Sequence, residues 1–103
     1  MVLVTAMYPN GPGTKFDQDY YLKTHIPLVK ARWGGMGLTD VSLVRGVANA
    51  DGSEPPYRVM ALLSFGSMAE FQKAAEAHAP EIFADIPRFT DVQPVIQINE
   101  THG

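Results

Sequence analysis

Hydrophobic and polar residues follow strand-like and helix-like spacings in turn along this chain. Residues 2–8 form a short apolar run with β-branched members, closed by the Pro- and Gly-rich segment 9–13, which predicts a strand and a turn. A capping box at Thr14 and Asp17 then predicts the start of a helix, and the glycines of segment 34–37 predict its end. Four apolar residues share one face of this helix: Leu22, Ile26, Val29 and Trp33.

The second half of the chain begins with two predicted strands. Residues 40–47 alternate with period two, and a loop over residues 48–56 carries the turn dipeptide Asp51-Gly52. Residues 57–65 predict the next strand, but here both alternating sets of residues are apolar. One face carries Tyr57, Val59, Ala61, Leu63 and Phe65, whereas the other carries Met60 and Leu62.

A second capping box, formed by Ser67 and Glu70, predicts the start of another helix. The side that we expect to be buried carries Met68, Phe71, Ala75 and His78. Pro80 and Pro87 follow, and proline removes a hydrogen-bond donor from a helix. We therefore expect a separate helical turn over residues 81–85 between these two prolines.

The last predicted strand covers residues 92–99, and Pro94 near its start favours an edge or bulge position. Residues 100–103 are expected to form a loose tail. The order of elements is β-α-β-β-α-β, which predicts the ferredoxin-like α+β fold with one antiparallel sheet and two helices on one face. Residues 1–103 are expected to form this single domain.

The apolar second face of the strand at residues 57–65 predicts a partner. The open side of an antiparallel sheet is usually polar, whereas Met60 and Leu62 make this one apolar. Monomers rarely expose an apolar sheet face of this size. The simplest cover is the same sheet of a second copy across a two-fold axis, so we expect a homodimer.

Composition and charge exclude several classes of function. The chain has 103 residues with 8 Lys and Arg against 11 Asp and Glu, and the net charge of −3 argues against nucleic acid as a partner. The absence of cysteine excludes disulfides, iron–sulfur clusters, thiolate metal sites and cysteine nucleophiles. No apolar run reaches the roughly 18 residues of a membrane helix, and the first residues lack the basic start of a signal peptide. We expect a cytoplasmic protein that makes no membrane contact.

The densest group of polar and aromatic residues lies within the first predicted helix. Tyr21 and His25 are four residues apart, so they share a helical face, and they border the apolar stripe. Pro27 should kink the helix around residues 24–26, because its ring collides with the carbonyl of Lys23 at a cost of about 3 kcal/mol. Either the kink aims His25 into a pocket, or Pro27 merely begins a second helical segment and a nearby carbonyl satisfies His25.

Other candidate residues have structural explanations beside the functional ones. His78 lies near a helix C-terminus, where histidine often only caps the helix. Asp85 and Asp91 are most simply caps or surface carboxylates. The internal histidines lack the spacing of metal ligands, and no segment matches a phosphate-binding loop, so we expect neither a metal nor another cofactor. Six aromatic residues either line a ligand pocket or belong to the core: Tyr8, Trp33, Tyr57, Phe65, Phe83 and Phe89.

Two segments carry a family pattern. The first is Phe16-Asp17-x-x-Tyr20-Tyr21-x-x-x-His25-x-Pro27-Leu28, and the second covers residues 83–94, from Phe83 to Pro94. Together they resemble the EthD family of the dimeric α+β barrel superfamily, and the resemblance spans essentially the whole chain. It implies a ferredoxin-like subunit whose sheet pairs with that of a partner to form a barrel. It also implies a link to bacterial degradation of ethyl tert-butyl ether beside a cytochrome P450 system.

The resemblance and the candidate residues support two hypotheses about function. The first is a cofactor-independent enzyme of oxidoreductase, monooxygenase or isomerase type that acts on a small aromatic or polyketide-like carbon acid. His25 would be its general base, and Tyr21 or Tyr20 would donate a hydrogen bond to the developing oxyanion. The expected ligand-binding residues are Tyr57, His78, Trp33 and Phe83.

The second hypothesis is a dimer without catalytic activity that binds a small apolar molecule or assists an oxygenase. It needs only an aromatic cavity, with His25 and Tyr21 as hydrogen-bonding residues that orient the ligand. A haem-dependent enzyme is less favoured than either, because only His25 or His78 could ligate the iron and neither has a recognisable haem context.

Overall fold

The computed structural model describes residues 1–101, and its elements follow the predicted order. The strands are β1 (Val2–Pro9), β2 (Leu38–Arg45), β3 (Tyr57–Phe65) and β4 (Val95–Glu100). The helical segments are α1 (Gln18–Tyr20), the π-helical turn η1 (Tyr21–His25), α2 (Ile26–Trp33), α3 (Met68–Asp85) and the 3₁₀ turn η2 (Ile86–Arg88). Of the expected tail, Glu100 belongs to β4, and residues 102 and 103 lie outside the described residues.

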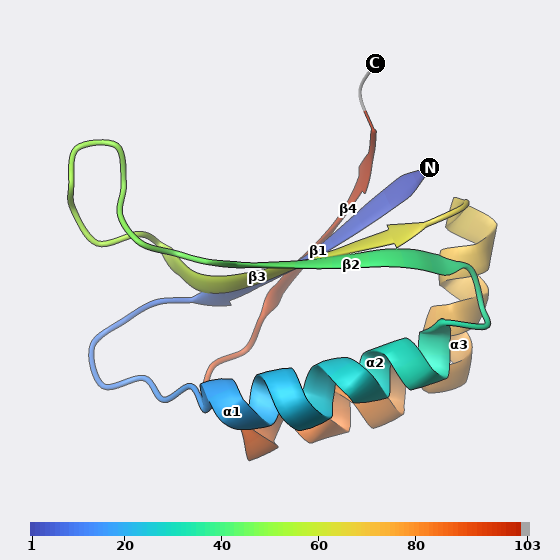
Figure 1. Ribbon diagram of the computed structural model, residues 1–103, viewed down its shortest axis with the longest axis horizontal. Coiled ribbons are helices and arrows are strands. Elements are labelled where there is room, and N and C mark those ends of the chain that lie inside the picture. Colours follow the sequence, from blue (N-terminus) through green and yellow to red (C-terminus); the bar gives the residue numbers. More distant parts are fainter. Residues whose placement is uncertain (102–103) are drawn as a thin grey trace.

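The strands form one antiparallel sheet in the order β2-β3-β1-β4. Helices α2 and α3 both lie on one side of this sheet, so the subunit has two layers (Figure 1). This arrangement confirms the predicted ferredoxin-like α+β fold. Within residues 1–101, strand β4 pairs only with β1, and it begins at Val95 rather than at residue 92, because Pro94 has no N–H to donate to a ladder.

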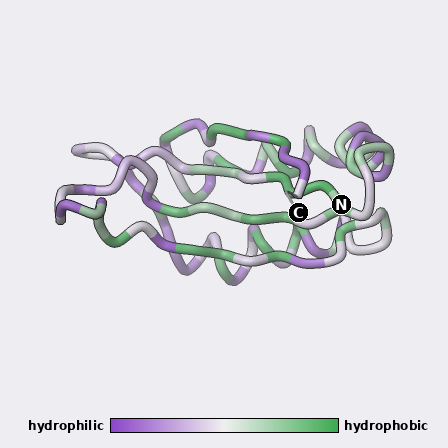
Figure 2. Tube along the Cα trace, turned by 90° about the horizontal axis from the view of Figure 1, so that it is seen from above, coloured by the Kyte–Doolittle hydropathy of each residue, from purple (hydrophilic) through white to green (hydrophobic). Residues whose placement is uncertain are grey.

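The core lies between the sheet and the helices. On the helix-facing side of β3, Val59, Ala61, Leu63 and Phe65 are buried. Met60 and Leu62 on its other face are half-buried, as the double apolar pattern predicts. Trp33 of α2 packs edge-on against Phe65 of β3, with ring centroids 5.7 Å apart. Figure 2 looks down on the sheet and shows that hydrophobic residues follow its central strands.

The first helix differs from its prediction in two respects. The residue that caps it is Asp17 rather than Thr14, because the Asp17 side chain accepts a hydrogen bond from the Tyr20 backbone N–H. The Thr14 hydroxyl instead donates to the Gly11 carbonyl within the preceding turn. Leu22 is 51% exposed and does not belong to the buried stripe, because the π-helical turn η1 rotates Tyr21 and His25 inward in its place.

The second helix is longer than predicted. Helix α3 runs without interruption through Pro80 to Asp85, so the expected separate turn over residues 81–85 is wrong. Pro80 lies on the exposed side of the helix, while Ala74 and Ile82 on either side of it are buried in the core, and this burial outweighs the lost hydrogen bond. Met68 is exposed rather than part of the buried side. No helix within residues 1–101 is long and apolar enough to cross a membrane.

Candidate functional site

A wide helical turn brings Tyr21 and His25 into the interior. The Ile26 backbone N–H donates to the Tyr21 carbonyl five residues earlier, and Pro27 follows in the first turn of α2. Proline cannot donate to the carbonyl of Lys23 and its ring crowds that group, so the turn widens into a π-helix, which confirms the predicted disruption. Tyr21 and His25 are only 1% and 3% exposed, and their rings stack with centroids 5.8 Å apart.

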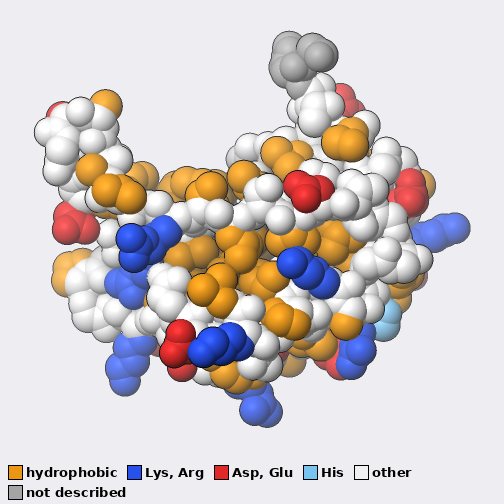
Figure 3. Space-filling model, viewed as in Figure 1, with side chains coloured by type: hydrophobic (Ala, Val, Ile, Leu, Met, Phe, Trp, Pro, Cys, Tyr) orange, Lys and Arg blue, Asp and Glu red, His pale blue; other side chains and the backbone are white. Residues whose placement is uncertain are grey.

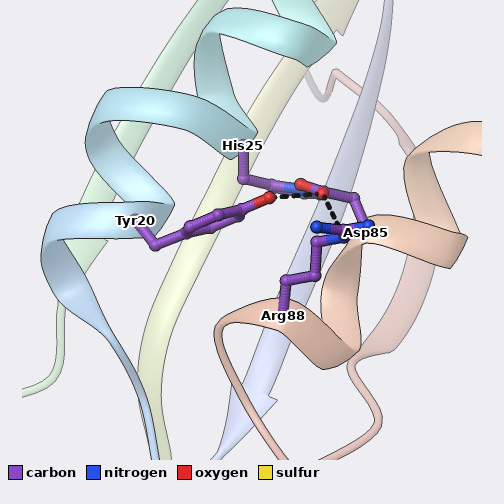
Figure 4. A network of polar contacts seen from close by, with 4 residues as sticks. All are labelled: Tyr20, His25, Asp85 and Arg88. Carbon is purple, nitrogen blue, oxygen red and sulfur yellow. Dashed lines mark hydrogen bonds and ion pairs between the residues drawn. The ribbon is translucent and has the colours of Figure 1, made fainter.

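The partner of His25 is a carboxylate from the far end of the chain. The Nδ1 atom of His25 lies 2.9 Å from Oδ2 of Asp85, the last residue of α3. The Tyr20 hydroxyl donates to the other oxygen, Oδ1, at 2.7 Å, and Arg88 Nε lies 3.7 Å from it. Figure 4 shows the side chains of Tyr20, His25 and Arg88 converging on Asp85 from the two helical regions. His25 is thus held by a carboxylate and not by the backbone carbonyl of the alternative interpretation of Pro27.

The electrostatics of this cluster leave His25 neutral. Burial lowers the pKa of His25 below its usual value near 6.5, and the Asp85 carboxylate opposes this only in part. Burial works against the charged form of Asp85, but hydrogen bonds from Tyr20 and His25 outweigh it and lower the pKa of Asp85. An ionised carboxylate only accepts hydrogen bonds, so Nδ1 of His25 carries the proton. Nε2 therefore keeps a free lone pair at neutral pH.

The two neighbouring tyrosines have different surroundings. The hydrogen bond to Asp85 raises the pKa of Tyr20, whose hydroxyl is occupied by that bond. Burial raises the pKa of Tyr21, which therefore remains a hydroxyl donor. Within residues 1–101 the buried Tyr21 hydroxyl has no hydrogen-bond partner. Such an orphaned buried hydroxyl is rare in native proteins and indicates a place for another polar group.

Tyr21 and His25 both line an apolar cavity of about 90 Å³ between the sheet and the helices. Figure 3 shows hydrophobic side chains gathered between the sheet and α2. A larger surface groove of about 420 Å³ lies beside the cavity, along residues 86–94 and the start of β4. The two spaces adjoin, because four residues line both of them: Phe83, Ile86, Pro94 and Ile96.

The predicted site residues fall into two groups. Tyr21, His25, Trp33 and Phe83 line the cavity, and Phe83 also lines the groove. Tyr20 does not line the cavity but lies behind His25. Asp85 links the two residues, because it forms a hydrogen bond with each of them. Tyr57 at the start of β3 and His78 on α3 line neither the cavity nor the groove.

Asp85 is the site residue that the sequence prediction missed. The expected role as a cap or surface carboxylate is wrong, since the Asp85 side chain caps no helix and is only 13% exposed. Its position in the segment 83–94, which carries half of the family pattern, is a signal that could have identified it. Asp91, by contrast, is exposed and accepts a hydrogen bond from the Lys15 backbone N–H.

Metal binding finds no support in the described part of the chain. Residues 1–101 contain no group of three or more His, Asp or Glu side chains that could hold a metal ion. The polar atoms of Asp85 and Nδ1 of His25 are bound to one another and to Tyr20, so they do not present a set of free ligands.

Comparison with known proteins shows which family has this fold and sequence. An EthD-like protein from Ralstonia eutropha JMP134 is 37% identical, with a TM-score of 0.88 over 96% of this chain and 89% of the other. The chain belongs to the EthD family. An ethyl tert-butyl ether D (EthD) family protein from Bacillus halodurans C-125 has a TM-score of 0.80 at 22% identity, over 99% of both chains.

More distant structures share only the fold of this EthD family protein. A protein from Bordetella bronchiseptica described as an antibiotic biosynthesis monooxygenase has a TM-score of 0.64 at 11% identity, over 99% of this chain and 97% of the other. Neither a scan against protein-family models nor a search of curated proteins found a match. The comparisons therefore establish the family and the fold of this chain.

Proposed function

We propose that this EthD family protein is a cofactor-independent enzyme that removes a proton from a small aromatic or polyketide-like carbon acid. The observation that carries the proposal is the free Nε2 of a buried, neutral His25 that lines an apolar cavity and is backed by Asp85. A general base has to be uncharged before the reaction, and it works best when its pKa is near the working pH. Burial gives His25 this property.

The neighbouring groups suit the charge that develops during proton removal. As Nε2 accepts the proton from carbon, the imidazolium that forms is stabilised by the Asp85 carboxylate 2.9 Å from Nδ1. The Tyr21 hydroxyl, which has no partner among residues 1–101, donates to the oxygen of the developing enolate or phenolate. Tyr20 acts through Asp85, because its hydroxyl bond holds the carboxylate in place, and is a positioning residue.

Proton removal from carbon is a step shared by oxygenation, isomerisation and cyclisation. The names of two similar structures, an ethyl tert-butyl ether D family protein and an antibiotic biosynthesis monooxygenase, favour oxidative chemistry on small organic molecules. An oxidoreductase of monooxygenase type is therefore our first choice among the three, with a role in the breakdown of ethers or other foreign compounds.

We further propose that the working form is a homodimer that pairs the open faces of two sheets. One row of apolar residues crosses all four strands on that face, from Val44 through Met60 and Met7 to Val95. Val44 and Val95 are 45% and 44% exposed, so the row is uncovered in the single chain. Sedimentation should show two chains, and Met60→Lys should shift the protein to one chain; a wild-type monomer at micromolar concentration contradicts this proposal.

Proton removal can be measured without knowing the natural substrate. In deuterated water, NMR follows exchange of the methyl protons of acetophenone, a neutral carbon acid with a single aromatic ring. We expect the protein to accelerate exchange, and His25→Gln to reduce that acceleration roughly a hundredfold or more. His78→Gln is the matched control and should retain it. Equal exchange rates in the wild-type and His25→Gln proteins would refute the proposal.

The orphaned Tyr21 hydroxyl also favours the second hypothesis, a non-enzymatic dimer that binds a small ligand or assists an oxygenase. In that case His25→Gln and Tyr21→Phe weaken ligand binding, but the protein accelerates no exchange. The NMR exchange experiment therefore separates the two functions directly, since a bound ketone with unchanged carbon–hydrogen exchange identifies a binding protein.

A further inference from the structure

The lining of the cavity defines the chemical class of its ligand. We propose that the cavity binds neutral phenols and rejects carboxylates, phosphates and amines of similar size. This inference rests on the proposed function, in that the cavity is the ligand site, but it requires no turnover.

The charges around the cavity exclude ionic ligands. Among the described residues, no Lys, Arg, Asp or Glu lines the cavity. Within residues 1–101, Asp91 is the one charged residue that lines the outer groove, and Asp85 lies directly behind His25. Arg88 lies 3.7 Å from Asp85 but lines neither space. An anion would therefore find no positive charge among the lining residues, and burial of an unpaired charge is costly. An ammonium group is also disfavoured in the cavity. His25 separates it from the Asp85 carboxylate, which already holds Tyr20 and His25 by hydrogen bonds.

Polar side chains reach the cavity from two sides, Tyr8 from β1 and Tyr21 and His25 from the helical wall. Trp33 Nε1 is already used, since it donates to the Ala74 carbonyl at 2.7 Å, and Nδ1 of His25 is held by Asp85. The Tyr21 hydroxyl has no partner within residues 1–101, and Nε2 of His25 makes no hydrogen bond there either. A ligand hydroxyl suits both groups, because it donates to Nε2 and accepts from Tyr21. Ether and ketone oxygens only accept and leave Nε2 unpaired.

The size of the cavity favours a single aromatic ring. An apolar cavity of about 150 Å³ takes up benzene in another protein. The inner cavity here is smaller, about 90 Å³, but it adjoins the outer groove at Phe83, Ile86 and Pro94. A phenol therefore enters with its hydroxyl toward Tyr21 and His25, while ring substituents extend toward the groove.

The chain contains its own reporter of ligand binding. Trp33 is the only tryptophan of the sequence and lines the cavity, so its fluorescence responds to occupancy. The full chain is titrated at neutral pH with phenol, benzene, benzoate and benzylamine, by tryptophan fluorescence and calorimetry. We expect phenol to bind roughly ten- to a hundredfold more tightly than benzene, as two net hydrogen bonds provide, and the two ions not to bind measurably.

The variant Tyr21→Phe tests the hydrogen bond itself. It should weaken phenol binding roughly three- to tenfold and leave benzene binding unchanged, which also shows that the cavity is intact. Tyr57→Phe makes the same chemical change away from the cavity and should alter neither affinity. Benzoate or benzylamine binding as tightly as phenol overturns the inference, as does absent phenol binding or an equal loss for phenol and benzene in Tyr21→Phe.

The outcomes distinguish this inference from the proposed reaction. Selective phenol binding by a protein that accelerates no proton exchange supports the ligand class and refutes the enzyme. Accelerated exchange that depends on His25, in a protein that binds benzoate as well as phenol, supports the enzyme and refutes the ligand class.

Discussion

Replacement of Asp85 with asparagine removes the charge behind His25 while it preserves the shape of the side chain. In the wild-type protein the carboxylate accepts hydrogen bonds from His25 Nδ1 at 2.9 Å and from the Tyr20 hydroxyl at 2.7 Å. A hydrogen bond to a charged group contributes about 1.5–3 kcal/mol and a neutral one about 0.5–1.5 kcal/mol. The bond to buried His25 alone should therefore lose about 1 kcal/mol, and we expect the free energy of unfolding of Asp85→Asn to fall by at least that amount.

The same substitution should change which nitrogen of His25 carries the proton. An asparagine side chain presents an NH₂ group as well as an oxygen, so it no longer fixes the proton on Nδ1. Urea unfolding at pH 7 measures the stability, and long-range ¹H–¹⁵N NMR spectra of the imidazole show the tautomer directly. The matched control is Asp91→Asn, which alters an exposed carboxylate with one backbone N–H partner and should shift stability by no more than about 0.5 kcal/mol.

Two results would refute this reasoning. The first is an Asp85→Asn protein with wild-type stability and an unchanged His25 spectrum, which would mean that the carboxylate does not hold the imidazole. The second is an equal loss of stability in Asp85→Asn and Asp91→Asn, which would assign the effect to overall charge instead of the hydrogen bond.

Three further predictions concern stability and access to the cavity. Tyr21→Phe removes an orphaned buried hydroxyl, so thermal unfolding should show an unchanged or higher free energy, by up to about 1 kcal/mol; a clear loss would mean that the hydroxyl has a partner. Because burial lowers the pKa of folded His25, the unfolded chain binds the proton more readily, and urea unfolding should show a free energy of unfolding that falls below about pH 6.5. His25→Gln should flatten this decline. Parallel curves of stability against pH for the wild-type and His25→Gln proteins would contradict the prediction. Phe83 is 46% exposed where the cavity adjoins the groove, so stopped-flow fluorescence of Phe83→Ala should show faster phenol association, and an unchanged rate would place the entrance elsewhere.

The fold could be predicted because its signals are local. The period-two pattern of β3 predicts a strand and the Ser67–Glu70 capping box predicts a helix start, each from a few neighbouring residues. Both elements occur in the structure. The errors arose where tertiary packing overrides a local preference. Pro80 stays within α3 because the residues on either side of it are buried, and no local rule contains that information.

The site could be predicted only in part, for a related reason. The spacing of Tyr21 and His25 is local, so their shared face was evident, and Pro27 indicated the disturbed turn. Asp85 lies 60 residues beyond His25, and apart from its place in the family segment 83–94 no local pattern distinguishes it from a surface carboxylate. Only the fold brings the end of α3 beside η1, and only the fold shows which carboxylate His25 meets.

The π-helical turn η1 has a consequence for how this site arises and disappears during evolution. Its carbonyl–amide bond from Tyr21 to Ile26 spans one residue more than an α-helical bond, so the turn contains one residue that a regular helix would not need. Loss of a single codon, such as that of exposed Leu22 or Thr24, would restore a regular helix without disturbing the sheet. Such a descendant would keep Tyr21 and His25 in its gene but rotate the Tyr21 side chain relative to His25, which stays in register with α2. Within a lineage, the length of this short segment should therefore track the chemistry more closely than the identity of any one residue.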